Sequence, residues 1–312
     1  MDVGVYLPQA GFSWAELRQR AQCCDREGIG SLWLMDHLVT PGMPKLPAFE
    51  AWTTASALGA VTERLRIGHL VNCNGFRHPA LLAKMAITLD HTSGGRLNLG
   101  LGSGSFAPEF AQVGLPHPDA RTRAAQLDEA LTVIRRLFTE ETVSFAGTHY
   151  QLTDAASVPR PIQHPYPPIH VGGAGPRYTL PIVARHADVW NCPTYALGAL
   201  PERIERLRAC CAAIGRSPDT IRITEEAVLA LVARREQVAD ARDAAARRFA
   251  GDGWGFAISD YCGTPDDVVA RLRARERLGV QGVVFFLHDR GAPETLRLLA
   301  REVLPALRRG SP

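Results

Sequence analysis

The chain of 312 residues has few lysines, no long hydrophobic run and no sign of a secretion signal. Lys45 and Lys84 are its only lysines, and 35 basic against 32 acidic residues leave a net charge of +3. Because this charge is small and no five Lys or Arg residues are consecutive, we expect no nucleic-acid partner. No run of 18 apolar residues occurs, so we expect no transmembrane helix and no membrane partner. Residues 1–5 lack the charged region and apolar stretch of a signal peptide, which predicts a cytoplasmic protein.

Cysteine motifs are also absent, although the chain has seven cysteines. Cys23-Cys24 and Cys210-Cys211 are adjacent pairs, and no Cys-x-x-Cys pair or zinc-type spacing occurs. We therefore expect reduced thiols, in agreement with a cytoplasmic location, and no bound metal.

The sequence does contain a regular alternation of short apolar segments with amphipathic ones. Hydrophobic residues make up 46% of the chain and charged residues 21%, values typical of globular proteins. Strands are predicted at 3–7, 31–35, 65–71, 97–100, 169–171, 189–191, 221–231 and 282–287. Helices are predicted at 14–27, 53–62, 79–91, 121–138, 178–186, 200–214, 235–249, 265–278 and 293–307.

This alternation predicts an α/β protein with a (β/α)8 TIM barrel, formed by a single domain that spans 1–312. Several strands are continuous apolar runs, as a parallel sheet buried on both faces requires. A doubly wound open sheet is the alternative. Residues 140–168 interrupt the pattern with five prolines and a short hairpin-like segment, so we interpret them as an insertion after the fourth β/α unit.

The carboxyl ends of the strands are where a TIM barrel carries its functional groups. Asp36 and His37 follow the second predicted strand directly. A carboxylate beside an imidazole suits acid–base chemistry, because histidine titrates near neutral pH. The alternative is a histidine that hydrogen bonds to Asp36 and only holds the loop.

Two glycine-rich segments also follow predicted strands. Residues 100–105, Gly-Leu-Gly-Ser-Gly-Ser, lack the third glycine of the dinucleotide-binding fingerprint, so Ser103 and Gly104 are only a weak sign of a ligand. Residues 172–176, Gly-Gly-Ala-Gly-Pro, open a predicted helix whose free N–H groups can bind an anion, and Arg177 adds a positive charge. This segment predicts a phosphate site, with a plain tight turn as the alternative.

Other polar and aromatic residues near the predicted strand ends have structural interpretations as their default. Asn72 and Asn74 are ordinary loop formers, and His69 and His170 fall inside strands, where core or layer positions are expected. Four aromatic residues are candidates for the wall of an apolar pocket, although core packing is the default for each: Trp190, Tyr195, Trp254 and Phe256.

Six motifs follow one another along nearly the whole chain. They are Gly-Ser-Leu-Trp-Leu-Met-Asp-His at 30–37, Arg-Leu-Arg-Ile-Gly at 64–68, Phe-Arg-His-Pro-Ala-Leu-Leu-Ala-Lys at 76–84, the segment 89–104 with Thr-Ser-Gly-Gly-Arg near its start, the proline-rich segment 159–177, and Ala-Asp-Val-Trp-Asn at 187–191. In this order they resemble the bacterial luciferase-like family of flavin- and deazaflavin-dependent oxidoreductases. The resemblance implies a TIM barrel, in agreement with the alternation of strands and helices.

The resemblance also implies an isoalloxazine-type ring at the barrel mouth, over the end of the third strand. Family members often carry a non-proline cis peptide there, and the corresponding bond in this chain is Leu70–Val71. The phosphate of the cofactor is expected at 172–175. The implied cofactor-binding residues are Asp36, Leu70, Val71, Asn72, Ser103, Gly104, Gly172, Gly173, Ala174, Gly175 and Arg177.

The family has two main branches, which use FMN with dioxygen or the 5-deazaflavin coenzyme F420. Asp36-His37 and the run Asp-His-Leu-Val-Thr-Pro at 36–41 resemble the F420 branch, in which the matching histidine lies near the hydride-transfer centre. The resemblance therefore implies an F420-dependent oxidoreductase in which hydride passes between deazaflavin C5 and the substrate. His37 would transfer the accompanying proton, and Asp36 would orient His37.

The chain departs from the deazaflavin-dependent sugar-phosphate dehydrogenases of this family. Their acidic catalytic residue corresponds to Ser105, with Glu109 as a nearby substitute, and their phosphate-binding lysines have no counterpart. We therefore expect a small organic substrate with a C=C, C=N or C=O bond rather than a sugar phosphate.

Two alternative functions remain open at this point. In an FMN-dependent monooxygenase, Asn72 or Asn74 would help to hold a flavin peroxide, and a partner flavin reductase would supply reduced FMN. A non-catalytic flavin-binding protein is the third reading of the residues. A homodimer is expected from the family, with the predicted helices 53–62 and 79–91 as candidate interfaces.

Overall fold

The barrel predicted from the sequence is present and closed. The computed structural model describes residues 1–249 and 261–308. Within this part, parallel strands surround the barrel in the order β1 (Asp2–Tyr6), β2 (Ser31–Leu34), β3 (Arg66–His69), β5 (Leu97–Gly102), β8 (Ile169–Gly172), β9 (Val189–Cys192), β10 (Arg222–Leu231) and β12 (Gly282–Leu287). Pairing of β12 with β1 and of β9 with β10 completes the ring, which excludes the open doubly wound sheet.

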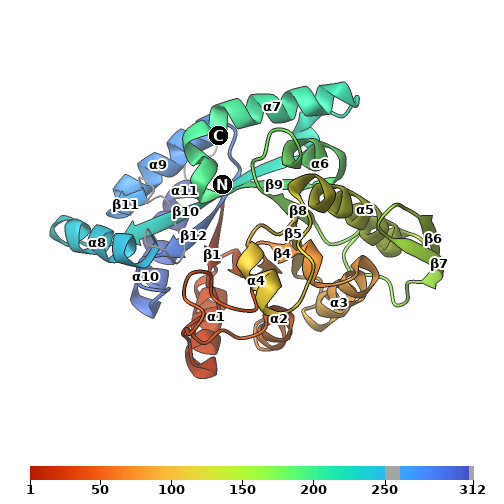
Figure 1. Cartoon of the computed structure of the whole chain (residues 1–312). Helices are drawn as coiled ribbons and strands as arrows, with labels where there is room; N and C mark the ends of the chain where they lie inside the picture. The colour runs from red at the N-terminus through yellow and green to blue at the C-terminus, as the bar shows by residue number, and fades with distance from the viewer. Residues whose placement is uncertain (250–260, 309–312) are drawn as a thin grey trace.

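The helices lie outside this ring, as Figure 1 shows. They are α1 (Trp14–Glu27), α2 (Ala51–Ala60), α3 (Pro79–Thr92), α4 (Ala107–Gln112), α5 (Ala120–Thr139), α6 (Thr179–His186), α7 (Leu200–Ala213), α8 (Val238–Phe249), α9 (Pro265–Arg277), α10 (Pro293–Leu298) and α11 (Leu304–Arg308). A π-helical turn, Leu299–Val303, joins α10 to α11. Short 3-10 turns occur at Asn74–Phe76, Thr194–Ala199, Pro218–Thr220 and Arg235–Gln237.

The predicted insertion contains an antiparallel hairpin, β6 (Thr142–Ala146) and β7 (Gln151–Ala156). It projects beside α5 at the right-hand edge of Figure 1. Glu129 on α5 holds the hairpin turn, because its carboxylate accepts hydrogen bonds from the backbone N–H groups of residues 148, 149 and 150 at 2.9, 2.8 and 3.1 Å. Three short elements were not predicted: α4, β4 (Asn72–Cys73, paired with β5) and β11 (Tyr261–Gly263, paired with β10).

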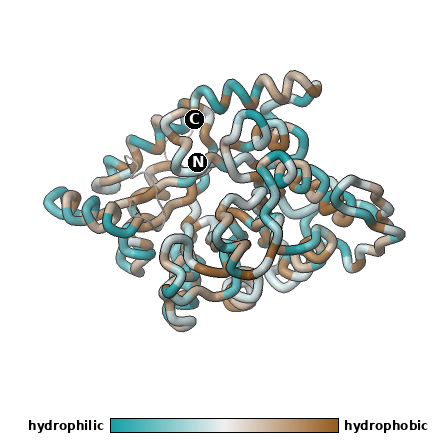
Figure 2. Tube along the Cα trace, viewed as in Figure 1, coloured by the Kyte–Doolittle hydropathy of each residue, from teal (hydrophilic) through white to brown (hydrophobic). Residues whose placement is uncertain are grey.

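Hydrophobic side chains fill two regions. The larger one lies between the sheet and the helices, and Figure 2 shows the hydrophobic stretches along the central strands while the outer helices alternate in hydropathy. The smaller one fills the barrel interior and consists mainly of Tyr6, Trp33, Met35, Leu70, Val228, Val284 and Phe286. Gly4 and Gly68 make room for the Trp33 indole, because a Cβ atom at either position would lie 3.0 or 2.9 Å from it. We refer to these interior side chains as the barrel plug.

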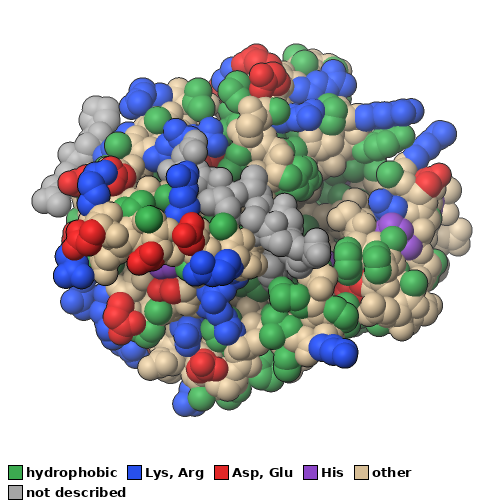
Figure 3. All heavy atoms as spheres, turned by 60° about the vertical axis from the view of Figure 1, so that its left-hand side comes forward, with side chains coloured by type: hydrophobic (Ala, Val, Ile, Leu, Met, Phe, Trp, Pro, Cys, Tyr) green, Lys and Arg blue, Asp and Glu red, His purple; other side chains and the backbone are tan. Residues whose placement is uncertain are grey.

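The outer surface carries charges of both signs. Figure 3 shows arginine and acidic side chains interspersed over one face of the molecule. Several of them form partly exposed ion pairs, such as Arg136 on α5 with Glu140, the residue that follows this helix. Within 1–249 and 261–308, no helix combines the length and apolar character needed to cross a bilayer.

One acidic residue joins the first β/α unit to the next. Asp25 on α1 accepts hydrogen bonds from the backbone N–H groups of Glu63, Arg64 and Leu65 at 3.0, 2.8 and 2.7 Å. Partial burial raises the pKa of Asp25, but these three donors together outweigh it and hold the pKa below its usual value. The carboxylate therefore connects α1 to the entry of β3.

We expect Asp25→Asn to lower the free energy of unfolding by about 1–3 kcal/mol at pH 7, because an amide oxygen replaces a carboxylate that accepts three N–H groups. Because the pKa of Asp25 is lower in the folded than in the unfolded protein, the ionised carboxylate stabilises the fold at pH values above its unfolded-state pKa. This stabilisation is lost as the pH falls through the folded-state pKa. Thermal unfolding of both proteins from pH 7 to pH 3 measures this. A stability difference that stayed constant with pH would contradict the role of the charge.

Candidate active site

A cavity of about 520 Å³ opens at the carboxyl ends of the barrel strands. Its buried floor is formed by Tyr6, Leu70 and Phe286, and exposed side chains such as Tyr195 stand at its rim. This size lies within the range of small-molecule and cofactor sites. The lining includes these residues proposed from the sequence: Asp36, His37, Leu70, Val71, Ser103, Gly104, Ser105, Glu109, Gly172 and Gly173.

His37 is held at the rim by Glu109. The Nδ1 atom of His37 lies 2.8 Å from a carboxylate oxygen of Glu109. Glu109 lies on α4 and is 1% exposed, and it also accepts hydrogen bonds from the backbone N–H groups of Leu38 and Val39. A neutral His37 in this arrangement carries its proton on Nδ1, which leaves Nε2 as the basic nitrogen. In the described chain Nε2 has no hydrogen-bond partner, so the imidazole can exchange a proton with a ligand.

Asp36 does not orient His37, which corrects the expectation from the sequence. Its carboxylate is 1% exposed and forms a bidentate ion pair with Arg77, at 2.6 Å from Nη1 and 2.9 Å from Nη2. The backbone N–H of Cys73 donates a third hydrogen bond to it at 2.8 Å. Two adjacent residues in an extended segment point to opposite sides, so Asp36 is turned toward the β3–α3 loop and His37 toward Glu109.

Val71 forms one wall of the cavity. The Leu70–Val71 peptide is cis, as the resemblance implied. The Val71 side chain lies against the backbones of β5 and β8, where Cβ atoms at Gly102 and Gly172 would lie 2.5 and 2.7 Å from its methyl groups. Only glycine fits this close approach, and the result is a flat apolar wall beside open backbone at Gly172 and Gly173.

Some predicted cofactor residues lie elsewhere. Asn72 is completely buried, and its side chain accepts from Trp52 Nε1 and donates to the Gly100 carbonyl, both at 2.7 Å. Its amide is therefore a structural link between α2 and β5 and does not reach the cavity. Ala174 and Gly175 are not among the residues that line the cavity, and Arg177 is exposed with its guanidinium over the Tyr178 ring.

The glycine-rich segment after β8 is a less open anion site than the sequence predicted. The backbone N–H of Gly173 donates to the Asn191 carbonyl at 3.2 Å, so it is not free. Helix α6 begins at Thr179, three residues after the end of this segment. Thr179 lines the cavity. Thr179 and the N-terminal turn of α6 are therefore the groups that can receive a phosphate here.

Comparison with known proteins identifies the family. A family model described as luciferase-like monooxygenase matches residues 1–253. The chain belongs to the luciferase-like family. The matched relatives are oxidoreductases, so the protein is an enzyme of this class.

Relatives of the luciferase-like barrel use both types of cofactor. An FMNH(2)-dependent dimethylsulfone monooxygenase of Pseudomonas putida is 28% identical over 93% of this chain and 87% of its own length. An F420-dependent glucose-6-phosphate dehydrogenase of Kineococcus radiotolerans is 32% identical over 72% of this chain and 67% of its own length. A solved F420-dependent secondary alcohol dehydrogenase, in complex with an F420-acetone adduct, has a TM-score of 0.83 at 19% identity and covers 98% of this chain and 99% of its own. That likeness shows the fold.

The sequence analysis missed Glu226, an acidic side chain that lines the cavity of this luciferase-like enzyme. A signal was present, because two successive acidic residues, Glu225 and Glu226, occur inside a predicted buried strand, where unpaired charges are rare. Arg77 carried no such signal. Of the four aromatic candidates, Tyr195 lines the cavity, Trp190 is buried in the core, and Trp254 and Phe256 lie outside the described residues.

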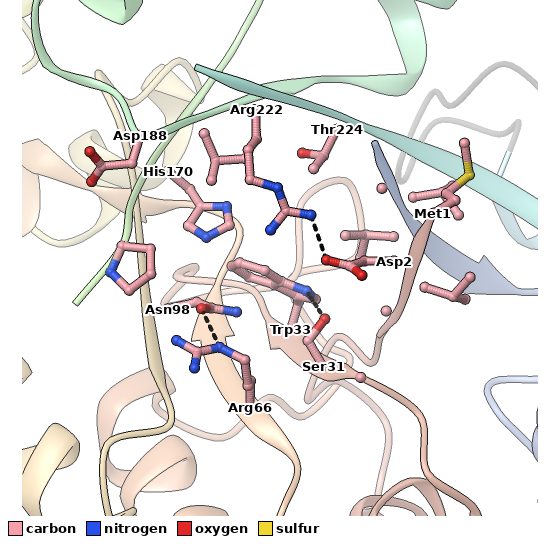
Figure 4. Close-up of a pocket in the computed structure, with 18 of the residues that line it drawn as sticks. Met1, Asp2, Ser31, Trp33, Arg66, Asn98, His170, Asp188, Arg222 and Thr224 are labelled. Carbon is pink, nitrogen blue, oxygen red and sulfur yellow. Dashed lines mark hydrogen bonds and ion pairs between the residues drawn. The ribbon is translucent and has the colours of Figure 1, made fainter. Parts of the chain in front are cut away.

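A second cavity of about 870 Å³ lies at the amino ends of the strands, on the other side of the barrel plug. Figure 4 shows Arg66 directed to Asn98 and Arg222 to Asp2 within it. His170 packs edge-on against Trp33 with ring centroids 4.8 Å apart, and burial, with the nearby charges of Arg66 and Arg222, lowers its pKa to about 3. His170 is therefore a neutral layer residue, and its place at the amino end separates it from the mouth where TIM barrels carry function.

Proposed function

We propose that the protein is an F420-dependent oxidoreductase that transfers hydride between deazaflavin C5 and a small organic substrate, with reduction of a C=C, C=N or C=O bond as the favoured direction. The observation that carries this proposal is the His37–Glu109 pair. It places an imidazole with a free Nε2 at the rim of the cavity and fixes the opposite nitrogen on a buried carboxylate. Such an arrangement is suited to proton transfer.

The cavity has features that fit a flat tricyclic cofactor. Val71 and Leu70 offer an apolar wall for a ring, and Ser103 and Gly104 border the same space. Thr179 at the start of α6 offers a hydroxyl and the positive end of the helix to a phosphate. When bound, F420 supplies a hydride donor or acceptor at C5.

His37 supplies the proton that accompanies the hydride. In a reduction, the protonated imidazole donates from Nε2 to the substrate atom beside the carbon that receives the hydride. The carboxylate of Glu109 stabilises the imidazolium before this step and keeps the ring oriented afterwards. In the reverse reaction the neutral ring accepts the proton at the same nitrogen. Asp36 takes no part in the transfer and instead fixes the loop that carries Cys73 and Arg77.

The FMN-dependent alternative is favoured by one observation, the dimethylsulfone monooxygenase that matches most of the chain. The two asparagines that would help to hold a flavin peroxide in this alternative do not support it. Asn72 is buried between α2 and β5, and Asn74 donates to the Tyr150 hydroxyl at 3.1 Å and lines a different hollow. Neither amide faces the cavity that contains His37. For this reason we favour F420.

Paired binding titrations of the purified protein with F420 and with FMN test the proposal. We expect F420 to bind at least about tenfold more tightly than FMN, a difference of about 1.4 kcal/mol. Reduced F420 should then be oxidised without oxygen when an unsaturated substrate is added. Tighter binding of FMN, together with substrate-dependent oxygen uptake in the presence of reduced FMN, would show a monooxygenase instead. Tight cofactor binding with no turnover on any donor would show a carrier protein.

A further inference from the structure

Glu226 is an acidic group at the floor of the cavity that the proton transfer through His37 does not use. Its Oε1 atom accepts a hydrogen bond from Asn191 Nδ2 at 2.8 Å. The hydroxyl of Thr224 donates to Asn191 Oδ1 at 2.9 Å, which fixes the direction of the Asn191 amide. No described residue forms a hydrogen bond with Oε2 of Glu226. One carboxyl oxygen is therefore held by the barrel, and the other is available to a ligand.

No positive charge of a described residue compensates Glu226. The described residues that line the cavity include neither lysine nor arginine. Burial raises the pKa of Glu226 to about 8, and the Asn191 hydrogen bond offsets this only in part. The titratable groups that face Glu226 are Tyr6 on β1, Cys192 on β9 and Tyr195 in the turn after β9. From β12 the residue that lines the cavity is the apolar Phe286. The pKa of each of these three groups is raised, that of Tyr6 and Cys192 mainly by burial, so all of them are neutral at pH 7 to 8.

Glu226 is consequently a neutral carboxylic acid at pH 7. Because Oε1 accepts from Asn191, the proton belongs on Oε2, where the hydroxyl can donate into the cavity. A protonated carboxylic acid in an apolar site is a strong hydrogen-bond donor to a carbonyl oxygen.

His37 and Glu226 stand on well-separated parts of the barrel mouth. His37 follows β2, and Glu226 lies on β10, with β12 and β1 between these strands in the ring. His37 is partly exposed at the rim, whereas Glu226 lies against the floor residues. Two donors on different parts of the mouth suit a substrate that one of them contacts at an oxygen and the other at a carbon. A conjugated carbonyl compound offers both, since its oxygen accepts a hydrogen bond and its α-carbon accepts a proton once hydride has added to the β-carbon.

We propose that Glu226 is a specificity-determining residue that donates a hydrogen bond from Oε2 to the carbonyl oxygen of an α,β-unsaturated carbonyl substrate. The hydride of the reduced deazaflavin adds to the β-carbon, and the C=C electron pair moves to the α-carbon. His37 donates its proton to the α-carbon, so the C=C bond becomes a C–C bond with one hydrogen added at each end. Glu226 keeps its proton throughout. The choice of substrate class rests on the proposed function, whereas the hydrogen bond from Glu226 does not.

Infrared difference spectroscopy tests the hydrogen bond without turnover. The wild-type protein, saturated first with oxidised F420 and then with FMN, is mixed with cyclohexenone, cyclohexene or cyclohexylamine. We expect a carboxylic-acid carbonyl band that disappears in Glu226→Gln, titrates with a midpoint near pH 8, and shifts with cyclohexenone but not with cyclohexene. Loss of the band with cyclohexylamine would show a cation site and overturn the proposal. Absence of the band, or no shift with any probe, would also overturn it.

Kinetics with cyclohexenone and reduced F420 test the consequence for specificity. We expect kcat/KM of the wild type to fall as the pH rises through about 8, because the acid loses its proton. In Glu226→Gln the loss near pH 8 should be absent, since the amide still donates, whereas the requirement for a protonated His37 remains in both proteins. Glu226→Met, which has no donor, should raise KM by about tenfold to a hundredfold with a much smaller change in kcat. Equal pH profiles for wild type and Glu226→Gln would contradict the proposal.

Glu225→Gln is the matched control on the same strand. Glu225 faces away from the cavity, where it accepts a hydrogen bond from the Tyr261 hydroxyl at 2.7 Å and pairs with Arg275 at 3.2 Å. This variant should lower thermal stability but leave the cyclohexenone-sensitive band and the loss of kcat/KM near pH 8 unchanged. If F420 fails to bind, the proposed function is wrong, and the infrared experiment in the presence of FMN still decides whether Glu226 donates to a carbonyl.

Discussion

Replacement of His37 by alanine should lower kcat by about 10²–10⁴-fold, the usual contribution of a positioned acid or base. The dissociation constant for F420 should change little, because the ring wall at Val71 and the start of α6 stay in place. The physical reason is that no other imidazole lines the cavity among the described residues, so the proton has no equivalent donor. Stopped-flow oxidation of reduced F420 and a fluorescence titration of F420 measure the two quantities separately.

His164→Ala is the control for the His37 variant, because His164 is exposed and lies on the proline-rich insertion. Glu109→Gln adds a test of orientation. The amide can still accept from His37 Nδ1, but it no longer stabilises the imidazolium, so we expect a loss of kcat that is smaller than the loss in His37→Ala. If His37→Ala kept full turnover, His37 would be a loop anchor, the alternative that the sequence left open.

Replacement of Arg77 by alanine should lower the free energy of unfolding by about 3–5 kcal/mol, the cost of leaving a buried carboxylate without its partner. Asp36 is 3% exposed, and Arg77 binds both of its oxygens. Burial lowers the pKa of Arg77, but the hydrogen bonds and charge of Asp36 more than offset this and raise it above its usual value. Urea or thermal unfolding measures the loss.

Arg136→Ala provides a matched comparison. Arg136 also forms a bidentate pair, with Glu140 at 2.8 Å for both contacts, but its side chain is 34% exposed and that of Glu140 is 41% exposed. Water screens such a pair, so this variant should lower the free energy of unfolding far less than Arg77→Ala does. Similar losses for the two variants would refute the importance of burial. The double variant Asp36→Asn with Arg77→Leu should recover part of the stability, since it leaves no charge behind.

Local sequence patterns correctly predicted the helices and strands that are determined by neighbouring residues, such as capping residues and short apolar runs. The helix at 14–27 has its predicted bounds, because Ser13 forms a capping box with Glu16 and Gly28 adopts a left-handed conformation. The last strand, Gly282–Leu287, also has its predicted bounds, since it is a continuous apolar run between a glycine and a polar loop. Helix α4 was missed because it has only six residues and no periodicity can be seen over such a length.

The site depended on contacts that no local pattern contains. Glu109 is 72 residues from His37, and Arg77 is 41 residues from Asp36, so the choice of partner is made by the closed barrel. Neighbours in sequence, Asp36 and His37, face opposite sides and have different partners. The glycines at 102 and 172 could be recognised as ligand-facing backbone, but their contact with Val71 required the three-dimensional register of β5, β8 and the turn after β3.

The barrel plug lies between the active-site cavity and the second cavity at the amino ends of the strands. Trp33 and the other side chains of the plug fill the barrel interior, so the two cavities are separate among the residues that the structure describes. Cofactor and substrate would therefore approach from the same side of the barrel, at the carboxyl ends of the strands.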